Sequence, residues 1–209
     1  MDGNRRWAKA RGLPPQAGHA EGAKVFRRLI DDCCHGFGID CMTFYAFSTE
    51  NKSRQEKEIE ALTAIFGKYL DDISKLTDSD IRLKFIGDLS FFSPKFASKA
   101  HKAEETSANR TGMKVVVALN YGGRAELERA ARLSAANGGG IAEYLYDTEY
   151  PDLDLLVRTG GEKRLSNFLL WQSAYAELYF TDKLWPDFTK DDLQAAIDEY
   201  ASRNKRFGR

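Results

Sequence analysis

The sequence predicts an α/β fold: a single domain with a mostly parallel central sheet of about six strands, flanked by helices. Short β-branched or aromatic runs alternate with helix-periodic segments along all 209 residues, and this alternation is typical of a parallel sheet covered on both faces. The apolar content of 43% is sufficient for one full core, and a chain of this length normally forms one domain. We therefore expect residues 1–209 to fold as one unit.

The composition limits the classes of protein to which the chain can belong. Its 31 basic and 31 acidic side chains balance to a net charge of zero, so no broad basic field favours nucleic acid as a partner. Three cysteines cannot all pair and form no CxxC motif, which indicates reduced thiols. No run approaches 18 apolar residues, and no signal peptide is recognisable. We expect a cytoplasmic protein that can still meet an apolar substrate at the inner face of a membrane.

Residues 2–7 form the most chemically distinctive segment. A carboxylate (Asp2), a side-chain amide (Asn4) and two guanidinium groups (Arg5, Arg6) lie within five residues, beside a glycine. Arginine binds phosphate oxygens in pairs, and a carboxylate approaches the same phosphate when a divalent cation lies between them. Diphosphate carrying Mg²⁺ satisfies all of these groups. The alternative is a solvated, charged segment that precedes a helix.

The first half of the chain predicts a helix, a strand and a second helix, in that order. Apolar spacing over 19–35 predicts a helix whose first turn, with His19, is an anion site, the alternative being that His19 only caps the helix. The apolar run 41–47 predicts a buried strand, and 55–76 a long helix with an unusually wide apolar stripe. We favour ordinary packing of this stripe between sheet and solvent over the alternative that part of it lines a cavity.

The second half continues the alternation. Strands are predicted over 81–86, 113–119 and 153–157. Helices are predicted over 94–109, 125–136, 141–146 and 190–203. Residues 168–180 are an apolar aromatic stretch before the break at Trp185-Pro186.

Polar clusters follow three of the predicted strands, at 48–51, 120–124 and 158–166. The carboxyl ends of parallel strands meet at one edge of a sheet, where ligands bind. In the third cluster, Arg158 and Arg164 bracket a Gly-Gly turn ahead of Ser166, which makes a second anion cradle. Two anion sites beside an apolar stripe suggest two diphosphate substrates with apolar tails. No P-loop, GxGxxG, G-x-S-x-G or DDxxD motif occurs, which disfavours nucleotide, hydrolase and trans-prenyl chemistry.

Five ordered motifs span nearly the whole chain. They are Met-Asp-Gly-Asn-Arg-Arg-Trp-Ala (1–8), Gly18-His19, Phe47-Ser48-Thr49-Glu50-Asn51, Asn120-Tyr121-Gly122-Gly123-Arg124, and 158–172 with its continuation at 174–180 and 184–186. In this order they resemble the cis-prenyltransferases, the Z-isoprenyl diphosphate synthases, and most closely the bacterial members that form undecaprenyl diphosphate. The resemblance implies an elongated apolar tunnel in the fold, and a strand ahead of residue 1.

The resemblance also implies an activity. Members of the family are transferases that condense an allylic diphosphate, commonly farnesyl diphosphate, with successive isopentenyl diphosphates and make each new double bond Z. They use Mg²⁺ and act as homodimers. The implied product is a polyprenyl diphosphate delivered to the membrane, with undecaprenyl diphosphate, the lipid carrier precursor of cell-wall synthesis, as the leading candidate. A shorter-chain enzyme and a non-catalytic accessory subunit are the alternatives. Ala46, Leu62 and Met113 are candidates for the tunnel floor that sets product length.

Individual roles follow from the same resemblance. Asp2 would hold Mg²⁺, helped by Glu177 from the partner-facing region of a homodimer. The allylic diphosphate would contact Gly3, Asn4, Arg6 and His19, with Trp7 near the allylic group. The isopentenyl diphosphate would contact Arg158, Arg164 and Ser166. The site would be shaped by Phe47, Ser48, Glu50, Asn51 and Arg54. For the proton lost at each step, catalysis through Asn51, which orients the substrate, and a diphosphate oxygen as base both remain open.

Three features depart from the family pattern. The segment Pro14-Pro15-Gln16-Ala17 lacks the arginine that usually stands a few residues before the Gly-His pair. Lys52 stands where a tryptophan usually follows the Glu-Asn pair, and the link 138–140 is shorter than usual. One contact to the allylic diphosphate is therefore missing or replaced.

Overall fold

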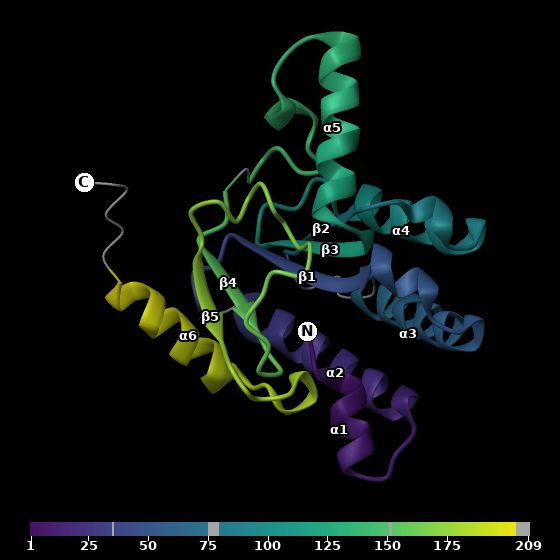
Figure 1. Ribbon diagram of the computed structural model, residues 1–209, viewed down its shortest axis with the longest axis vertical. Helices are drawn as coiled ribbons and strands as arrows, with labels where there is room; N and C mark the ends of the chain where they lie inside the picture. Colours follow the sequence, from purple (N-terminus) through teal and green to yellow (C-terminus); the bar gives the residue numbers. More distant parts are fainter. Residues whose placement is uncertain (35, 75–79, 151, 204–209) are drawn as a thin grey trace.

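The computed structural model describes residues 1–34, 36–74, 80–150 and 152–203. Its centre is a parallel sheet with the strand order β1-β3-β2 (Figure 1). These strands are β1 (Cys41–Ser48), β2 (Arg82–Ile86) and β3 (Lys114–Tyr121). All eight residues of β3 are buried, because a central strand with both faces covered has no side chain directed to water. The continuous apolar character of this segment has the same cause.

Helices enclose the sheet, and five of the six in the described chain begin or end close to their predicted positions. The helix at Asn4–Ala10 was not predicted, and the helix predicted over 141–146 is only a short 3₁₀ turn at Ile141–Tyr144. The six helices of the described chain are α1 (Asn4–Ala10), α2 (Pro15–Cys34), α3 (Glu56–Ser74), α4 (Pro94–Ser107), α5 (Gly123–Asn137) and α6 (Lys190–Ser202). In Figure 1, α2 and α3 lie side by side below the sheet, and α5 extends away from its other side. Short 3₁₀ turns occur at Thr49–Ser53, Leu89–Phe91, Ile141–Tyr144 and Trp185–Asp187.

Helix α2 starts earlier than predicted, and the predicted end of α3 lies outside the described residues. Helix α2 begins at Pro15 rather than at residue 19, because a proline without an N–H is readily accommodated in the first turn. His19 therefore lies inside the helix, and the prediction that it sits on a free first turn is wrong. Residues 75 and 76 of the helix predicted over 55–76 lie outside the described chain. No helix of the described residues is long and apolar enough to cross a membrane.

A second, two-stranded sheet carries the third polar cluster. It pairs β4 (Leu155–Arg158) with β5 (Glu177–Phe180) in parallel, with Arg158 opposite Phe180. The prediction of one sheet of about six strands is therefore wrong: the described residues form sheets of three and two strands. Most of the aromatic stretch 168–180 is not extended, because positive φ angles at Ser166, Asn167 and Leu169 (49°, 65° and 43°) turn the chain before β5 begins.

Candidate active site

Asp2 is the centre of the candidate site. Its Oδ2 accepts a hydrogen bond from Arg158 Nη2 (3.1 Å), and its Oδ1 lies 3.3 Å from Arg6 Nη2. Its backbone is fixed as well, since Thr159 Oγ1 accepts from the Asp2 N–H and donates to the Asp2 carbonyl. Burial acts to raise the pKa of Asp2, but the bonds and charges of Arg158 and Arg6 outweigh it and hold this pKa below its usual range. The site thus presents an ionised carboxylate between two guanidinium groups.

A glycine allows this close approach. Gly160 has φ +88°, and a Cβ there would lie 2.6 Å from Arg6 Nη2 and 3.2 Å from the Asp2 backbone. A side chain at this position would both strain the backbone and push the opening segment away from the turn that follows β4. The Gly-Gly turn after Arg158 therefore allows the opening segment to pack on the third polar cluster.

Arg158 also organises the second cradle. Its Nη1 donates to Ser166 Oγ (2.7 Å) and to the carbonyl of Arg164. The Arg164 side chain is itself exposed and bonds to Glu162 (2.6 Å). One guanidinium therefore connects Asp2 to Ser166, while the Arg164 guanidinium stays at the rim with a solvent-accessible partner.

The first and second clusters meet the third through Asn167. Its side chain donates to Glu50 Oε1 (2.9 Å) and accepts from the Arg124 N–H (2.9 Å), and its carbonyl accepts from the Gly123 N–H (2.7 Å). Burial acts to raise the pKa of Glu50, but the Asn167 bond and other local hydrogen bonds lower it overall. Helix α5 has no side-chain cap of its own, so a residue from a distant loop caps its first N–H groups. The predicted convergence of the three clusters is confirmed in this way, although the third cluster follows a strand of the separate two-stranded sheet.

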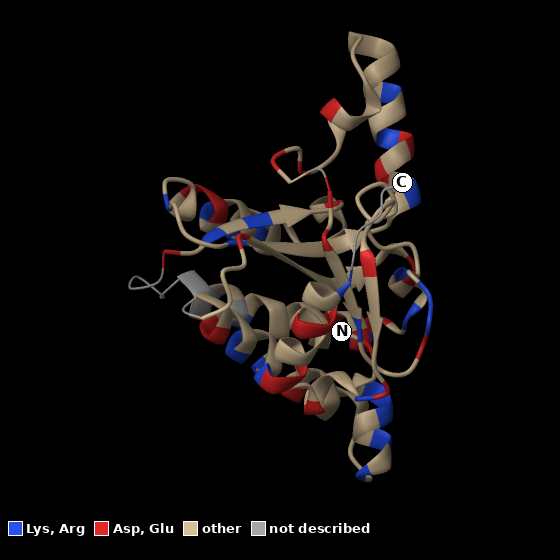
Figure 2. Cartoon of the chain, turned by 90° about the vertical axis from the view of Figure 1, so that its left-hand side faces the viewer, with Lys and Arg blue, Asp and Glu red and all other residues tan. Residues whose placement is uncertain are grey.

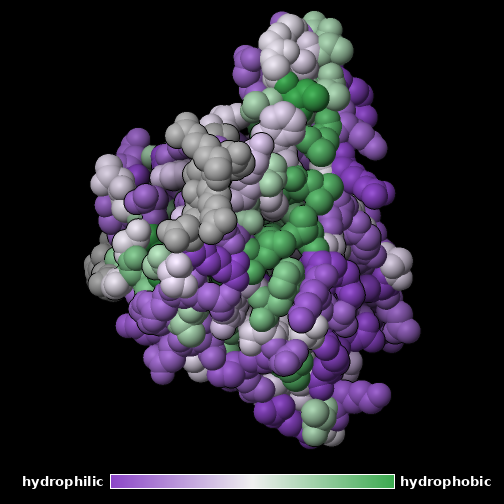
Figure 3. Space-filling model, turned by 60° about the vertical axis from the view of Figure 1, so that its left-hand side comes forward, coloured by the Kyte–Doolittle hydropathy of each residue, from purple (hydrophilic) through white to green (hydrophobic). Residues whose placement is uncertain are grey.

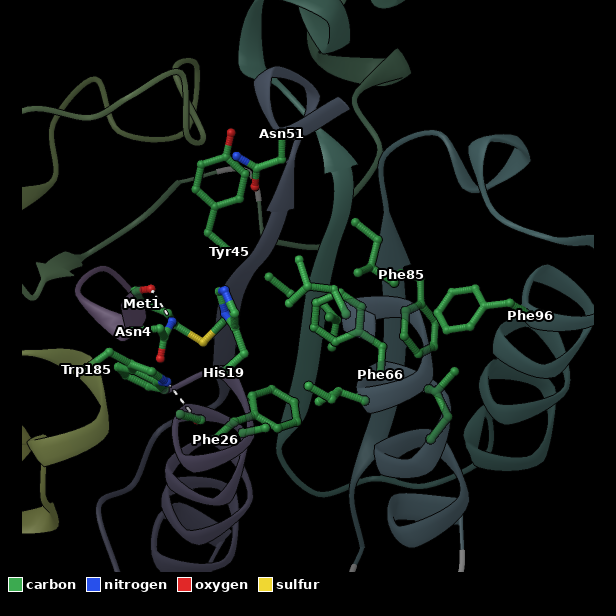
Figure 4. Close-up of a pocket in the computed structure, with 18 of the residues that line it drawn as sticks. Met1, Asn4, His19, Phe26, Tyr45, Asn51, Phe66, Phe85, Phe96 and Trp185 are labelled. Atoms are coloured by element: carbon green, nitrogen blue, oxygen red, sulfur yellow. Dashed lines mark hydrogen bonds between the residues drawn. The ribbon is translucent and has the colours of Figure 1, made fainter. Parts of the chain in front are cut away.

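An apolar cavity of about 160 Å³ lies next to this edge (Figure 4). Its polar lining, here called the mouth, includes Asn4, His19, Asn51 and Arg54. Its body is lined by apolar side chains from the sheet and from helices α2, α3 and α4, among them Phe26, Ala46, Leu62, Ile65, Phe66, Leu70, Leu83, Phe85 and Phe96. Part of the wide α3 stripe therefore lines a cavity, and our preference for ordinary packing of that stripe was wrong. Of the three candidates for the floor, Ala46 and Leu62 line the cavity and Met113 does not.

Two polar atoms at the mouth are buried without a hydrogen-bond partner in the protein. They are Asn4 Oδ1 and His19 Nε2. Burial lowers the pKa of His19 and the nearby Arg54 lowers it further, while Glu58 opposes this shift. Buried polar atoms in native proteins are normally hydrogen-bonded, and exceptions at a cavity mouth indicate a ligand position.

Other predicted site residues lie elsewhere. Phe47 is buried against Phe91 and Phe92 and does not line the cavity. Trp7 donates its indole N–H to Asp187 (2.7 Å) and also does not line the cavity. Glu177 lies at the amino end of β5 and bonds to Arg203.

Ser48 and Gly3 fix the backbone of segments that carry other site residues. The Ser48 N–H bonds to the Asn51 side chain (3.2 Å), which fixes the turn carrying Asn51 and Arg54. Gly3 has φ +112° and lets the chain turn against Leu184 into α1. Both residues shape the site through the backbone.

The sequence interpretation missed two residues of this region. Asn167 was only part of a motif, and its left-handed backbone could not be read from its neighbours. Glu58 lies on α3 with its carboxylate 3.1 Å from Arg54 Nη1. Its spacing of four residues from Arg54 on a helix-like segment was the available signal.

The donor set fits a magnesium ion bound together with substrate. No group of three or more His, Cys, Asp or Glu side chains that could hold a metal occurs in the described ranges, so a cage made only of protein ligands is not present there. Mg²⁺ in phosphate-binding sites usually takes one or two carboxylates and completes its shell with phosphate and water. Asp2, ionised and 38% exposed, matches this requirement.

Comparisons with known proteins agree with this geometry. The family model described as "Putative undecaprenyl diphosphate synthase" matches residues 1–208. The chain is 43% identical to an isoprenyl transferase of Treponema denticola, covering 100% of this chain and 94% of that protein. It is 42% identical to the ditrans,polycis-undecaprenyl-diphosphate synthase ((2E,6E)-farnesyl-diphosphate specific) of Salmonella typhi, covering 100% and 87%.

A solved structure shows the same fold. It is lavandulyl diphosphate synthase from Lavandula x intermedia in complex with dimethylallyl diphosphate, with a TM-score of 0.93, 36% identity and coverage of 100% of this chain and 95% of that one. The family model matches nearly the full length of the chain, and both relatives exceed 40% identity. Together they assign the chain to a family. The chain belongs to the cis-prenyltransferases, the family of the undecaprenyl diphosphate synthases.

Proposed function

We propose that the protein condenses farnesyl diphosphate with successive isopentenyl diphosphates in Z configuration, and that the product is undecaprenyl diphosphate. The observation that carries this proposal is that the opening segment holds the Asp2–Arg158 ion pair and also lines an apolar cavity through Met1 and Asn4. A relative of 42% identity over the whole chain carries the name of this activity. In each step, the allylic carbon–oxygen bond breaks, a carbon–carbon bond forms to the isopentenyl double bond, and a proton is lost.

The residues of the site have distinct tasks in this proposal. Arg6 and His19 bind the diphosphate that leaves, while Arg158 and Ser166 bind the diphosphate of the incoming isopentenyl unit. Fixed guanidinium groups and hydrogen-bond donors of this kind stabilise negative charge as it develops on the leaving group. The apolar walls keep water away from the allylic carbon while it carries cationic character. Asn51, at the mouth, orients the incoming double bond.

Mg²⁺ is the cofactor in this proposal, and Asp2 would hold it. A bound Mg²⁺ supplies additional neutralisation of the leaving diphosphate. Arg158 and Arg6 keep the Asp2 carboxylate ionised and oriented for this task. Glu177 lies at the far end of the β4–β5 pair from Arg158, so in this proposal it serves the site of a second copy.

A homodimer is therefore part of the proposal. Trp171 and Tyr175 are exposed at 40% and 76%, in the segment that precedes β5 and Glu177. On the face shown in Figure 3, apolar side chains gather in a strip that runs down from the end of the molecule where α5 lies. Charges in Figure 2 are mixed along the helices, with both signs interspersed. Burial of aromatic side chains between two copies fits these surfaces better than contact with a polyanion.

A shorter-chain cis-prenyl diphosphate synthase is the second candidate. It is favoured by the aromatic side chains of Phe85 and Phe96 in the cavity wall, and by the likeness to the lavandulyl enzyme. An accessory subunit without catalysis fits less well, because Asp2 and the arginines of both cradles are all present. Delivery of the product to the inner face of the membrane follows from its long apolar chain.

One experiment tests the proposal. The protein is incubated with Mg²⁺ and labelled isopentenyl diphosphate, with farnesyl diphosphate or dimethylallyl diphosphate as the primer, and products are separated by chain length. Elongation of farnesyl diphosphate to a C55 product that stops when Mg²⁺ is chelated is the expected outcome. Short products would favour the second candidate, and a complete lack of elongation with both primers would exclude catalysis.

A further inference from the structure

Glu58 places a carboxylate beside Arg54 and His19, two polar residues that line the cavity. Its Oε1 lies 3.1 Å from Arg54 Nη1 and 3.7 Å from His19 Nε2. The three side chains are largely shielded from water, with exposed fractions of 16% for Glu58, 25% for Arg54 and 11% for His19. Glu58 comes from α3, whereas His19 comes from α2, so the carboxylate joins two elements that border the mouth.

The Glu58 carboxylate hydrogen-bonds to Arg54 but reaches His19 only at a longer ion-pair distance. Arg54 and His19 both line the cavity. A separation of 3.7 Å is beyond hydrogen-bond reach, and His19 Nε2 is buried without a hydrogen-bond partner. Arg5, on α1, adds positive charge near both side chains. One carboxylate thus faces the side chains of Arg54, His19 and Arg5, which together offer more hydrogen-bond donors than a carboxylate can accept.

We infer that the Glu58 carboxylate is the counter-ion of the cradle formed by Arg54, His19 and Arg5 while no ligand is bound, and that an incoming diphosphate replaces this carboxylate on Arg54. This inference rests on the proposed function, since it concerns the same diphosphate site. Glu58 acts here as a residue that tunes affinity: it neutralises Arg54 while the site is free and repels the diphosphate once it is bound. The same repulsion assists release of the pyrophosphate that each condensation leaves behind.

The electrostatics support an exchange of this kind. Opposite charges at about 3 Å in a partly buried site attract one another strongly, and like charges at similar distances repel. The diphosphate carries more charge and more acceptor oxygens than a carboxylate, so it can engage Arg54, His19 and Arg5 together. Glu58 also raises the pKa of His19, although burial and Arg54 lower it overall.

The test measures binding of inorganic pyrophosphate at this site. Glu58→Gln removes the charge but keeps an amide oxygen that can accept from Arg54, so the guanidinium stays in place. Glu60→Gln, at an exposed position two residues further along α3, is the matched control. The ring proton signals of His19, assigned with a His19→Gln variant, report binding in this cradle and not in the cradle of Arg158.

We expect pyrophosphate to shift the His19 signal with a Kd roughly threefold to tenfold lower in E58Q than in wild type, and unchanged in E60Q. The pKa of His19 should fall in E58Q, since a group that raises it has been removed. An equal or higher Kd in folded E58Q would overturn the inference.

The outcome is independent of the elongation assay. Elongation by the wild type together with an unchanged pyrophosphate Kd in E58Q defeats this inference alone. Tighter pyrophosphate binding in E58Q without elongation by the wild type defeats the proposed function alone. If pyrophosphate does not shift the His19 signal in the wild type, no diphosphate binds beside Arg54 and His19, and the inference is overturned.

Discussion

The Asp2 carboxylate bonds to the Arg158 guanidinium across 156 positions of sequence, with Oδ2 3.1 Å from Nη2. This bond joins the opening segment to the end of β4, and through Ser166 to the loop beyond it. Two predicted anion cradles therefore share one guanidinium. Whatever binds at one cradle alters the electrostatic field at the other, which suits a reaction between two diphosphates.

Asp2→Asn tests the role of the carboxylate. The substitution keeps the shape and an acceptor for Arg158 but removes the charge that would hold Mg²⁺. We expect turnover in the elongation assay to fall by roughly 100-fold or more, with an unchanged circular dichroism spectrum. Asp191→Asn, at an exposed position in α6, should retain activity. Normal turnover in the Asp2 variant would contradict the metal role.

Arg158→Lys tests the shared guanidinium. Arginine contacts Asp2, Ser166 and the Arg164 carbonyl at once, and an ammonium on a flexible stem cannot reproduce this planar arrangement. The KM for isopentenyl diphosphate should rise by roughly tenfold or more, and by a larger factor than the KM for the allylic primer. Arg132→Lys, exposed on α5, serves as the control. An equal rise in both KM values would argue against separate cradles.

Much of this arrangement could be predicted because its elements have local signals. The run 41–47 predicted β1 within one residue of Cys41–Ser48, since a strand buried on both faces needs a continuous apolar run. The polar clusters at strand ends predicted an edge site, since the carboxyl ends of β1 and β3 coincide. Local patterns of this kind do not depend on distant partners.

The remaining features depend on tertiary contacts that leave no local pattern. The left-handed backbone of Asn167 is stabilised by Glu50, Gly123 and Arg124, which lie far away in sequence. The cavity wall of α3 looks like an ordinary core stripe, because cavity-lining and core positions demand the same apolar side chains. The division into two sheets likewise depends on which distant strands pair, and β4 pairs with β5 rather than with the central sheet.

Ala46→Leu tests the cavity as the chamber for the growing chain. Ala46 lines the cavity from β1, so added methyl groups there reduce the space that the product can fill. We expect shorter products, with the rate of the first condensation changed by no more than roughly threefold, because the mouth is untouched. Met113→Leu, at a buried position outside the cavity lining, should leave chain length unchanged. Full-length products from the Ala46 variant would show that the chain grows elsewhere.

Glu126→Ala tests a buried network behind the site. The Glu126 carboxylate accepts from Tyr121 Oη (2.5 Å), Gln172 Nε2 (3.2 Å) and the Tyr146 N–H (2.9 Å). Burial and this negative charge raise the pKa of Tyr121, so its hydroxyl remains a donor. Truncation leaves several buried donors without an acceptor, and we expect the free energy of unfolding in urea to fall by about 2 to 4 kcal/mol. Exposed Glu128→Ala should change it by no more than about 0.5 kcal/mol.

Asp192→Asn tests the cap of α6 through its dependence on pH. Asp192 accepts from the Thr189 N–H (2.8 Å) and from Lys183 Nζ (2.7 Å). Burial acts to raise the pKa of Asp192, but these bonds outweigh it and lower this pKa below 3.8. A carboxyl group whose pKa is lower in the folded state stabilises the fold above its unfolded pKa, and this contribution is lost as pH falls through the folded value.

The Asp192 variant should therefore be less stable than wild type by about 1 kcal/mol at pH 7, and the difference should shrink as pH falls below about 4. Thermal unfolding of both proteins across this range measures it. Lys183→Met should reproduce part of the loss at pH 7, because it removes the partner and leaves the cap to Thr189. A stability difference that stays constant down to pH 2 would mean that the charge of Asp192 contributes nothing and that only its hydrogen-bonding shape matters.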